Sequence, residues 1–141
     1  MKRFAILCLL VLAPALALAR AADTGSLTVT VLNVSDAGGQ LRVGVYDEAG
    51  FKDKHGTPVA GRQTLARPGT MTVTIENIPP GIYAVKMFQD VNRNGFFDFS
   101  SRMVEPYGLS NDPAVTAGLP NFDDAKFPVA AGANAITITL H

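Results

Sequence analysis

Four segments of the chain alternate apolar and polar residues, and this alternation constrains the fold more than any other feature. They are residues 27–31, 41–45, 71–75 and 136–140. Because successive side chains of an extended strand point to opposite faces, each segment predicts a strand with one buried face. Residues 82–88 are apolar on both faces except at Lys86, which predicts a central strand, and residues 126–129 are a weaker strand candidate.

Turn residues separate these segments. Residues 36–39 (Asp-Ala-Gly-Gly) predict a hairpin between the first two strands, and Pro79-Pro80-Gly81 precedes the central strand. Helical periodicity is weak, with at most a short helix near Asp53 or Asp123. We therefore expect an all-β fold: a single antiparallel β-sandwich of about seven strands. Two long loops, 47–65 and 89–124, should be functional or internally organised.

The N-terminus has the three parts of a secretory signal peptide. Lys2 and Arg3 precede an apolar run, which ends in the small residues Ala17 and Ala19. We expect residues 1–19 to be a signal peptide cleaved near Ala19, and residues 20–141 to form one exported domain, periplasmic or extracellular. The run is short for a spanning helix, which needs about 20 residues, so no membrane span is expected after cleavage. An uncleaved N-terminal anchor is the alternative.

Charge and cysteine content exclude several functions. The only cysteine, Cys8, lies in the signal peptide, so the exported domain has no disulfide, thiolate metal site or cysteine nucleophile. Cleavage leaves 10 basic and 12 acidic residues, a net charge of −2 without a basic cluster. The domain therefore lacks the basic patch that is typical of a nucleic-acid-binding surface. There is also no polybasic or amphipathic helical segment to bind an anionic membrane.

The second long loop contains a calcium-binding pattern. Residues 90–98 read D-x-N-x-N-G-x-x-D, the front part of an EF-hand loop. Its oxygen ligands would be the side chains of Asp90, Asn92, Asn94 and Asp98 and the carbonyl of Phe96. Gly95 stands at the position where an EF-hand loop turns sharply.

The pattern is incomplete at its end. Ser101 occupies the position of the bidentate glutamate, and Glu105 is the nearest carboxylate that could close the shell. No amphipathic helices flank the loop. We therefore expect a weak structural Ca²⁺ site, with a Kd of roughly 10⁻⁴–10⁻³ M as in extracellular modules. The alternative is an Asn/Gly-rich turn whose side chains cap their own backbone.

Other chemistry has little support. Residues 105–112 are polar, and Glu105 with Tyr107 could contact a ligand. Alternatively, this is a packed loop in which Tyr107 covers the sheet edge, while Ser110 and Asn111 satisfy backbone groups. A Ser-His-Asp hydrolase is not indicated, because the chain has only two histidines and no G-x-S-x-G motif. A zinc site is equally unsupported. We predict no catalytic residue.

Several motifs together resemble domain-of-unknown-function family 2141, which comprises small exported bacterial proteins. They are residues 27–31, 39–46, 79–85 (Pro-Pro-Gly-x-Tyr-Ala-Val), 90–98, 105–111 and 120–125. The resemblance implies an exported bacterial protein and no particular reaction. The Pro-Pro-Gly-x-Tyr segment also resembles transthyretin-like and carboxypeptidase-regulatory-like sandwiches, which implies a similar architecture. The hydroxyisourate hydrolases of that group end in Tyr-Arg-Gly-Ser, whereas this chain ends in Thr-Leu-His.

These observations favour an exported, non-enzymatic β-sandwich with a structural calcium loop, serving as a binding or structural protein for an unknown ligand or protein partner. Two alternatives stay open. One is a periplasmic or secreted enzyme acting on carbohydrate or peptide near Glu105 and Tyr107. The other is an adhesion or assembly subunit in which the terminal strand pairs with a partner strand.

Overall fold

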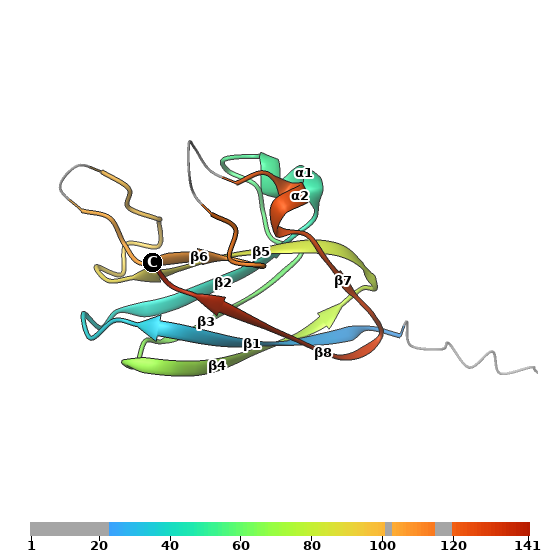
Figure 1. The fold of residues 1–141 in the computed structure, drawn as a ribbon, viewed down its shortest axis with the longest axis horizontal. Helices are drawn as coiled ribbons and strands as arrows, with labels where there is room; N and C mark the ends of the chain where they lie inside the picture. The colour runs from blue at the N-terminus through green and yellow to red at the C-terminus, as the bar shows by residue number, and fades with distance from the viewer. Residues whose placement is uncertain (1–22, 101–102, 115–119) are drawn as a thin grey trace, which may run out of the picture.

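Two β-sheets packed face to face form the molecule (Figure 1). The computed structural model describes residues 23–100, 103–114 and 120–141. The smaller sheet has the order β4-β1-β8, and the larger has the order β3-β2-β5-β6, with β7 also paired to β5. The strands are β1 (Gly25–Val34), β2 (Gln40–Tyr46), β3 (Ala60–Leu65), β4 (Gly69–Ile78), β5 (Gly81–Asp90), β6 (Tyr107–Leu109), β7 (Phe127–Val129) and β8 (Gly132–Thr139). The expected signal peptide, with Cys8, lies outside the described residues.

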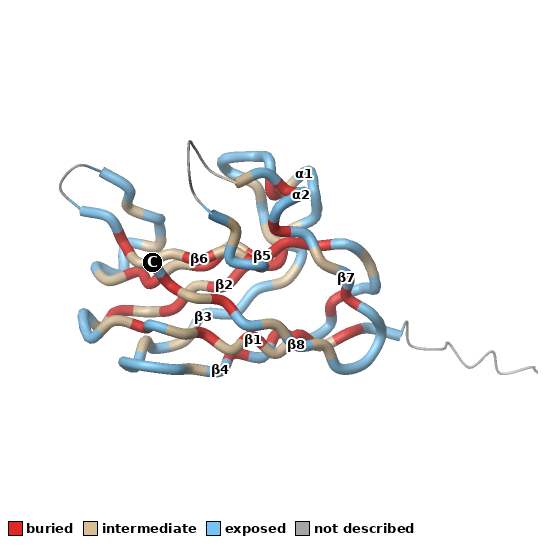
Figure 2. Tube along the Cα trace, viewed as in Figure 1, coloured by how far each residue is buried: buried red, intermediate tan, exposed pale blue. Residues whose placement is uncertain are grey.

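The core lies between the two sheets, where the alternating strands turn their apolar faces toward each other (Figure 2). Leu27, Val29 and Val31 of β1 and Val45 of β2 are completely buried. The prediction of a central strand at residues 82–88 is confirmed, because β5 pairs with β2 on one side and with β6 and β7 on the other. The weaker candidate at 126–129 is β7.

The expectation of a wholly antiparallel sandwich is wrong at one pair. β8 runs parallel to β1, from Gly25↔Gly132 to Leu32↔Thr139. The cause lies in the connection that precedes it. β7 pairs with the start of β5, and the chain then reaches the beginning of β1, where the Gly132 N–H donates to the Thr24 carbonyl (3.1 Å). Starting there, β8 can only follow β1 in the same direction.

The predicted hairpin at residues 36–39 is also wrong. A turn is present, but β1 pairs with β4 and β8, whereas β2 pairs with β3 and β5, so the turn joins the two sheets. The buried Gln89 side chain holds the turn: Nε2 donates to the carbonyls of Ser35 (3.1 Å) and Gly38 (2.7 Å), and Oε1 accepts the Ser35 N–H (2.9 Å). Alternation determines which face of a strand is buried, and it does not determine the partner strand.

The stretch 47–65 is more regular than expected. It contains α1 (Glu48–Lys52), capped by Asp47, whose carboxylate accepts the Gly50 N–H (2.8 Å), and the edge strand β3. β3 has no fully buried residue, so its sequence lacks the alternation that marks the other strands. Short helices occur near Asp53 and Asp123, as predicted: α1 and α2 (Phe122–Ala125).

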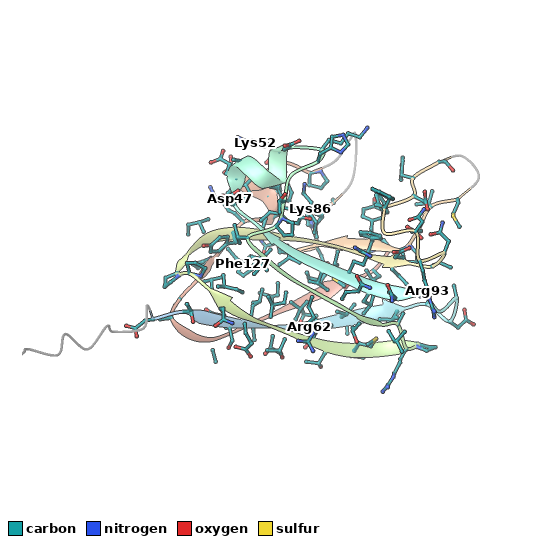
Figure 3. The ribbon with its side chains drawn as sticks, turned by 180° about the vertical axis from the view of Figure 1, so that it is seen from behind. Asp47, Lys52, Arg62, Lys86, Arg93 and Phe127 are labelled. Carbon is teal, nitrogen blue, oxygen red and sulfur yellow. The ribbon has the colours of Figure 1, made fainter. Side chains whose placement is uncertain are left out.

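The two helices cover one end of the outer face of the large sheet (Figure 1). The rings of Phe51 and Phe122 meet edge to face, with centroids 5.7 Å apart. Beneath α1, Lys86 of β5 donates to the Phe51 carbonyl and lies over the Phe51 and Tyr46 rings (Figure 3). Burial lowers the pKa of Lys86 from its ordinary value, which nearby Asp53 partly counteracts. In the described part of the chain, no helix is long and apolar enough to cross a membrane.

Candidate metal centre

The loop that follows β5 curls around the side chain of Asp90. Asp90 is the last residue of β5 and is fully buried. Its Oδ1 accepts the Asn94 N–H (3.1 Å) and its Oδ2 accepts the Gly95 N–H (2.9 Å). Arg93 and Gly95 both have positive φ, 60° and 86°, which bends the chain back on itself twice within three residues. The loop therefore closes over the carboxylate at its own start.

Three further side chains of the pattern converge inside this loop. The amide nitrogens of Asn92 and Asn94 donate to the same oxygen, Oδ2 of Asp98, at 2.7 and 2.8 Å. The amide oxygen of Asn92 accepts the Asn94 N–H (3.0 Å), and that of Asn94 accepts the Phe96 N–H (2.8 Å). The structure thus brings the side chains of loop positions 3 and 5 within hydrogen-bonding distance of the side chain at position 9.

Glu105 fastens the loop from the buried side. It is 1% exposed; its Oε1 accepts the Val91 N–H (2.8 Å) and its Oε2 accepts the Asp98 N–H (3.0 Å). Its own N–H donates to the Asp98 carbonyl (3.1 Å). Both carboxylate oxygens therefore bind the backbone at the two ends of the loop. The sequence marks Glu105 as a candidate ligand, and its spacing gives no sign of this bridging role.

Sequence reasoning missed Arg42. Its Nη1 lies 3.5 Å from Oδ2 of Asp90, so it supplies positive charge at the start of the loop. Arg42 stands 48 residues before Asp90, and only the pairing of β2 with β5 brings the two together, through the register Gln40↔Asp90. The alternation in β2 places Arg42 on the face opposite to the buried Leu41 and Val43. This was the only indication in the sequence that Arg42 lies outside the core.

The loop atoms that could coordinate a metal are carboxylate, amide and carbonyl oxygens. Among the described residues, no three His, Cys, Asp or Glu side chains are placed to hold a metal together. A cation here would be held by the carboxylates of Asp90 and Asp98 with amide and carbonyl oxygens. Such a set suits a hard cation and not Zn²⁺ or copper.

The segment after the loop is packed, as predicted by the alternative in which Ser110 and Asn111 of residues 105–112 satisfy backbone groups. Ser110 is fully buried; its hydroxyl accepts the Val85 N–H (2.8 Å) and donates to the Ala125 carbonyl. The Asn111 amide donates to the carbonyls of Asp124 (3.3 Å) and Lys126 (3.0 Å). Both side chains tie β6 to α2 and to the residue that follows it.

Neither Glu105 nor Tyr107 lines either of two surface depressions formed by the described residues. The Tyr107 ring packs edge-on against Phe97, with centroids 5.4 Å apart. A shallow depression of about 560 Å³ lies elsewhere and is lined by Glu48, Ile82, Phe122, Asp123, Lys126, Phe127 and Pro128. A second, polar one of about 310 Å³ is formed by β3 and β4. A catalytic pair at Glu105 and Tyr107 therefore gains no geometric support.

Comparison with known proteins identifies a family and no relative of known activity. The family model described as "Uncharacterized protein conserved in bacteria (DUF2141)" matches residues 29–137. The match extends from β1 into β8 and includes the whole loop from Asp90 to Asp98. No curated protein and no solved structure matches the chain.

Proposed function

The chain belongs to the DUF2141 family of uncharacterised bacterial proteins, and from that premise we propose that it is an exported, non-enzymatic β-sandwich whose β5 loop binds Ca²⁺ as a structural ion. Asp90, Asn92, Asn94, the Phe96 carbonyl and Asp98 provide the ligands. The bound ion stiffens a loop that joins the central strand β5 to the segment leading into β6. The proposed ion does not identify the ligand or protein partner that the sandwich binds.

One observation carries the proposal: the amides of Asn92 and Asn94 both point at Oδ2 of Asp98. In an EF-hand loop these three positions meet at the cation. Here their side chains already converge, so an ion entering between them needs little movement of the backbone. A turn that only caps its own backbone would not require Asp98 to join the two amides.

The charge in the loop favours a divalent cation. Asp90 and Glu105 are almost completely buried, and Asp98 is half-buried beside them. Arg42 offsets part of this negative charge from a distance of 3.5 Å to Asp90. Buried carboxylates require compensation by opposite charge or by hydrogen bonds. Asp90 and Glu105 have the hydrogen bonds, and a cation would offset the negative charge that Arg42 leaves.

The same contacts explain why the affinity should be modest. To present oxygen to the ion, each amide must turn about its Cβ–Cγ bond and give up its N–H bond to Asp98. Each lost hydrogen bond to a charged group is worth roughly 1.5–3 kcal/mol. Glu105 uses both oxygens on backbone N–H groups. Asp90 does the same with the Asn94 and Gly95 N–H groups, so a cation would have to share its oxygens with them. These costs agree with a Kd of about 10⁻⁴–10⁻³ M.

The two alternative functions gain less from the structure. An enzyme at Glu105 and Tyr107 would need an accessible acid or base, and Glu105 is 1% exposed. An assembly subunit would need a free edge on β8. The end of that edge is engaged: Asp112 accepts the Thr139 N–H (2.9 Å), and Tyr107 and His141 exchange two backbone hydrogen bonds.

Thermal unfolding tests the calcium site. If Ca²⁺ binds only the folded protein with a Kd of about 0.1–1 mM, tenfold to hundredfold excess stabilises it by about 1.4–2.7 kcal/mol. For a domain of this size, we expect about 10 mM Ca²⁺, which is that excess, to raise the Tm by roughly 5–10 °C over chelator.

Asp98→Asn removes one ligand charge without changing side-chain size and should abolish most of this rise. The exposed Glu76 of β4 provides the control, and Glu76→Gln should respond to Ca²⁺ as the wild type does. A Tm that is the same in chelator and in millimolar Ca²⁺ would refute the proposal.

A further inference from the structure

Asn94 stands directly before Gly95 in the loop, and this pair is the only Asn-Gly step in the chain. The backbone nitrogen of the next residue can attack Cγ of an asparagine and close a five-membered succinimide ring. A side chain on that next residue hinders the attack, and glycine has none. Every other asparagine of the chain precedes a larger residue. The sequence therefore marks Asn94 as the asparagine most open to this reaction.

The fold keeps Asn94 in contact with water. Its side chain is exposed, as is that of Arg93 before it, which lies at the end of the molecule that carries the loop (Figure 3). Gly95 has a φ of 86°, which glycine adopts without the strain that a Cβ would cause. The residue that lets the loop turn is thus also the residue that leaves the neighbouring side chain unprotected.

Hydrogen bonds hold the reacting atoms apart while the loop is closed. The Gly95 N–H donates to Oδ2 of the buried Asp90 (2.9 Å). The amide oxygen of Asn94 accepts the Phe96 N–H (2.8 Å), and its nitrogen donates to Oδ2 of Asp98 (2.8 Å). Because the attacking nitrogen must give up the proton that it donates to Asp90, the closed loop slows the reaction and an opening of the loop permits it.

From these contacts we propose that Asn94 is a deamidation site, and that its conversion to aspartate strengthens cation binding by the loop. The Gly95 nitrogen bonds to Cγ of Asn94, the Cγ–Nδ2 bond breaks, and the side-chain nitrogen leaves as ammonia with the proton from Gly95. Water then opens the succinimide. Attack at Cγ gives aspartate, and attack at the backbone carbonyl carbon gives isoaspartate.

The aspartate product changes the charge of the loop at one defined place. In the native chain the amide nitrogen of Asn94 lies 2.8 Å from Oδ2 of Asp98. In the product a carboxylate oxygen takes the place of that donor, so two negative charges face each other. They repel in the absence of a cation and attract a cation that lies between them.

The product also completes the calcium pattern further. The loop then reads D-x-N-x-D-G-x-x-D, with carboxylates at positions 1, 5 and 9, and the affinity of EF-hand loops rises with the charge of their ligands. This part of the inference rests on the proposed function. Isoaspartate acts in the opposite direction, because it inserts an extra carbon into the main chain just before the turn at Gly95 and moves that N–H away from Asp90.

Peptide mapping tests the modification. The purified protein is incubated at mildly alkaline pH in chelator, either folded or unfolded in urea, and is then digested with trypsin. Trypsin cuts after Arg93 and places Asn92 and Asn94 on different peptides, so Asn92, which precedes an arginine, is an internal control. Mass spectrometry then distinguishes amide from acid in each peptide.

We expect conversion at Asn94 and not at Asn92. In the folded protein it should be roughly tenfold to hundredfold slower than in urea, because a hydrogen bond from Gly95 to a charged acceptor must break first. Equal conversion of the two peptides in the folded protein would overturn the assignment of Asn94. Equal rates at Asn94 in folded and unfolded protein would overturn the protective role of the closed loop.

Asn94→Asp supplies the aspartate product directly and tests its effect on cation binding. Calorimetric titration at low salt should give a Kd for Ca²⁺ about tenfold lower than that of the wild type, and the Tm in chelator should be lower. Asn77→Asp is the matched control. It adds the same charge at an exposed asparagine of β4, near the start of β5 and not at its end, so Ca²⁺ binding should not change.

Failure of this inference and failure of the proposed function give different results. If the wild type does not bind Ca²⁺ but Asn94→Asp does, the proposed function is overturned and the inference stands. If the wild type binds Ca²⁺ and Asn94→Asp binds it no more tightly, the gain in affinity is overturned and the proposed function stands. If neither protein binds Ca²⁺, both are overturned.

Discussion

Replacing Glu105 by glutamine tests how the candidate loop is held on the sandwich. The carboxylate accepts the N–H groups of Val91 (2.8 Å) and Asp98 (3.0 Å). Glutamine has the same size but only one acceptor oxygen, so its NH₂ group must face one of these two donors. A buried N–H then loses its acceptor, and the free energy of unfolding should fall.

Two effects of opposite sign set the magnitude. Removing a buried charge recovers desolvation energy, which favours glutamine. Losing one hydrogen bond to a charged acceptor costs about 1.5–3 kcal/mol. The backbone N–H that loses its acceptor then faces the NH₂ group of the glutamine, and this contact between two donors adds to the cost. Because both oxygens of Glu105 are satisfied in the native protein, we expect the loss to dominate, with Glu105→Gln destabilising by about 2 kcal/mol.

Urea unfolding in chelator, followed by far-ultraviolet circular dichroism, measures this difference without a contribution from the ion. The m-value should stay unchanged, since the same surface is exposed on unfolding. Glu76→Gln on the exposed face of β4 is the control and should change stability by less than about 0.5 kcal/mol. If Glu105→Gln is as stable as the wild type or more stable, the bridging role of this carboxylate is refuted.

Two further predictions concern the surroundings of the loop. Arg42→Gln should lower stability in chelator by about 1 kcal/mol, because Asp90 loses the cation beside it. The same substitution should tighten Ca²⁺ binding by up to about tenfold at low salt, because a like charge near the ion is removed. Calorimetric titration of Ca²⁺ at low and high salt measures the direction of this change and its screening by salt. Gly39→Ala should destabilise far more than Gly38→Ala in urea unfolding, although both residues have positive φ. A Cβ on Gly39 would lie 2.2 Å from the Asp90 carbonyl oxygen, whereas a Cβ on Gly38 would meet nothing within 4 Å. Equal losses of stability would contradict the close approach of this turn to the loop.

The sequence predicted the faces of the strands well and their partners poorly. Apart from Leu140, which follows β8, the alternating segments lie within β1, β2, β4 and β8, because burial of one face is a local property of each segment. The parallel pairing of β8 with β1 depends on where β7 delivers the chain, which no local pattern records. β3 was missed because an edge strand with exposed faces needs no alternation.

The candidate site likewise has a part that a local sequence pattern predicts and a part that depends on the fold. The spacing of Asp90, Asn92, Asn94 and Asp98 is contained within one short segment, so a local pattern can describe it. The contributions of Arg42 and Glu105 come from other parts of the chain, and sheet register and burial determine them.

Density inside the loop of a crystal grown with Ca²⁺ is the most direct test of the central claim. We expect one ion among Asp90, Asn92, Asn94 and Asp98, with the amide oxygens of both asparagines turned toward it and ligand distances of about 2.3–2.6 Å. The amide nitrogens would then no longer contact Oδ2 of Asp98. A loop without an ion at saturating Ca²⁺, with both amides still donating to Asp98, would contradict the account.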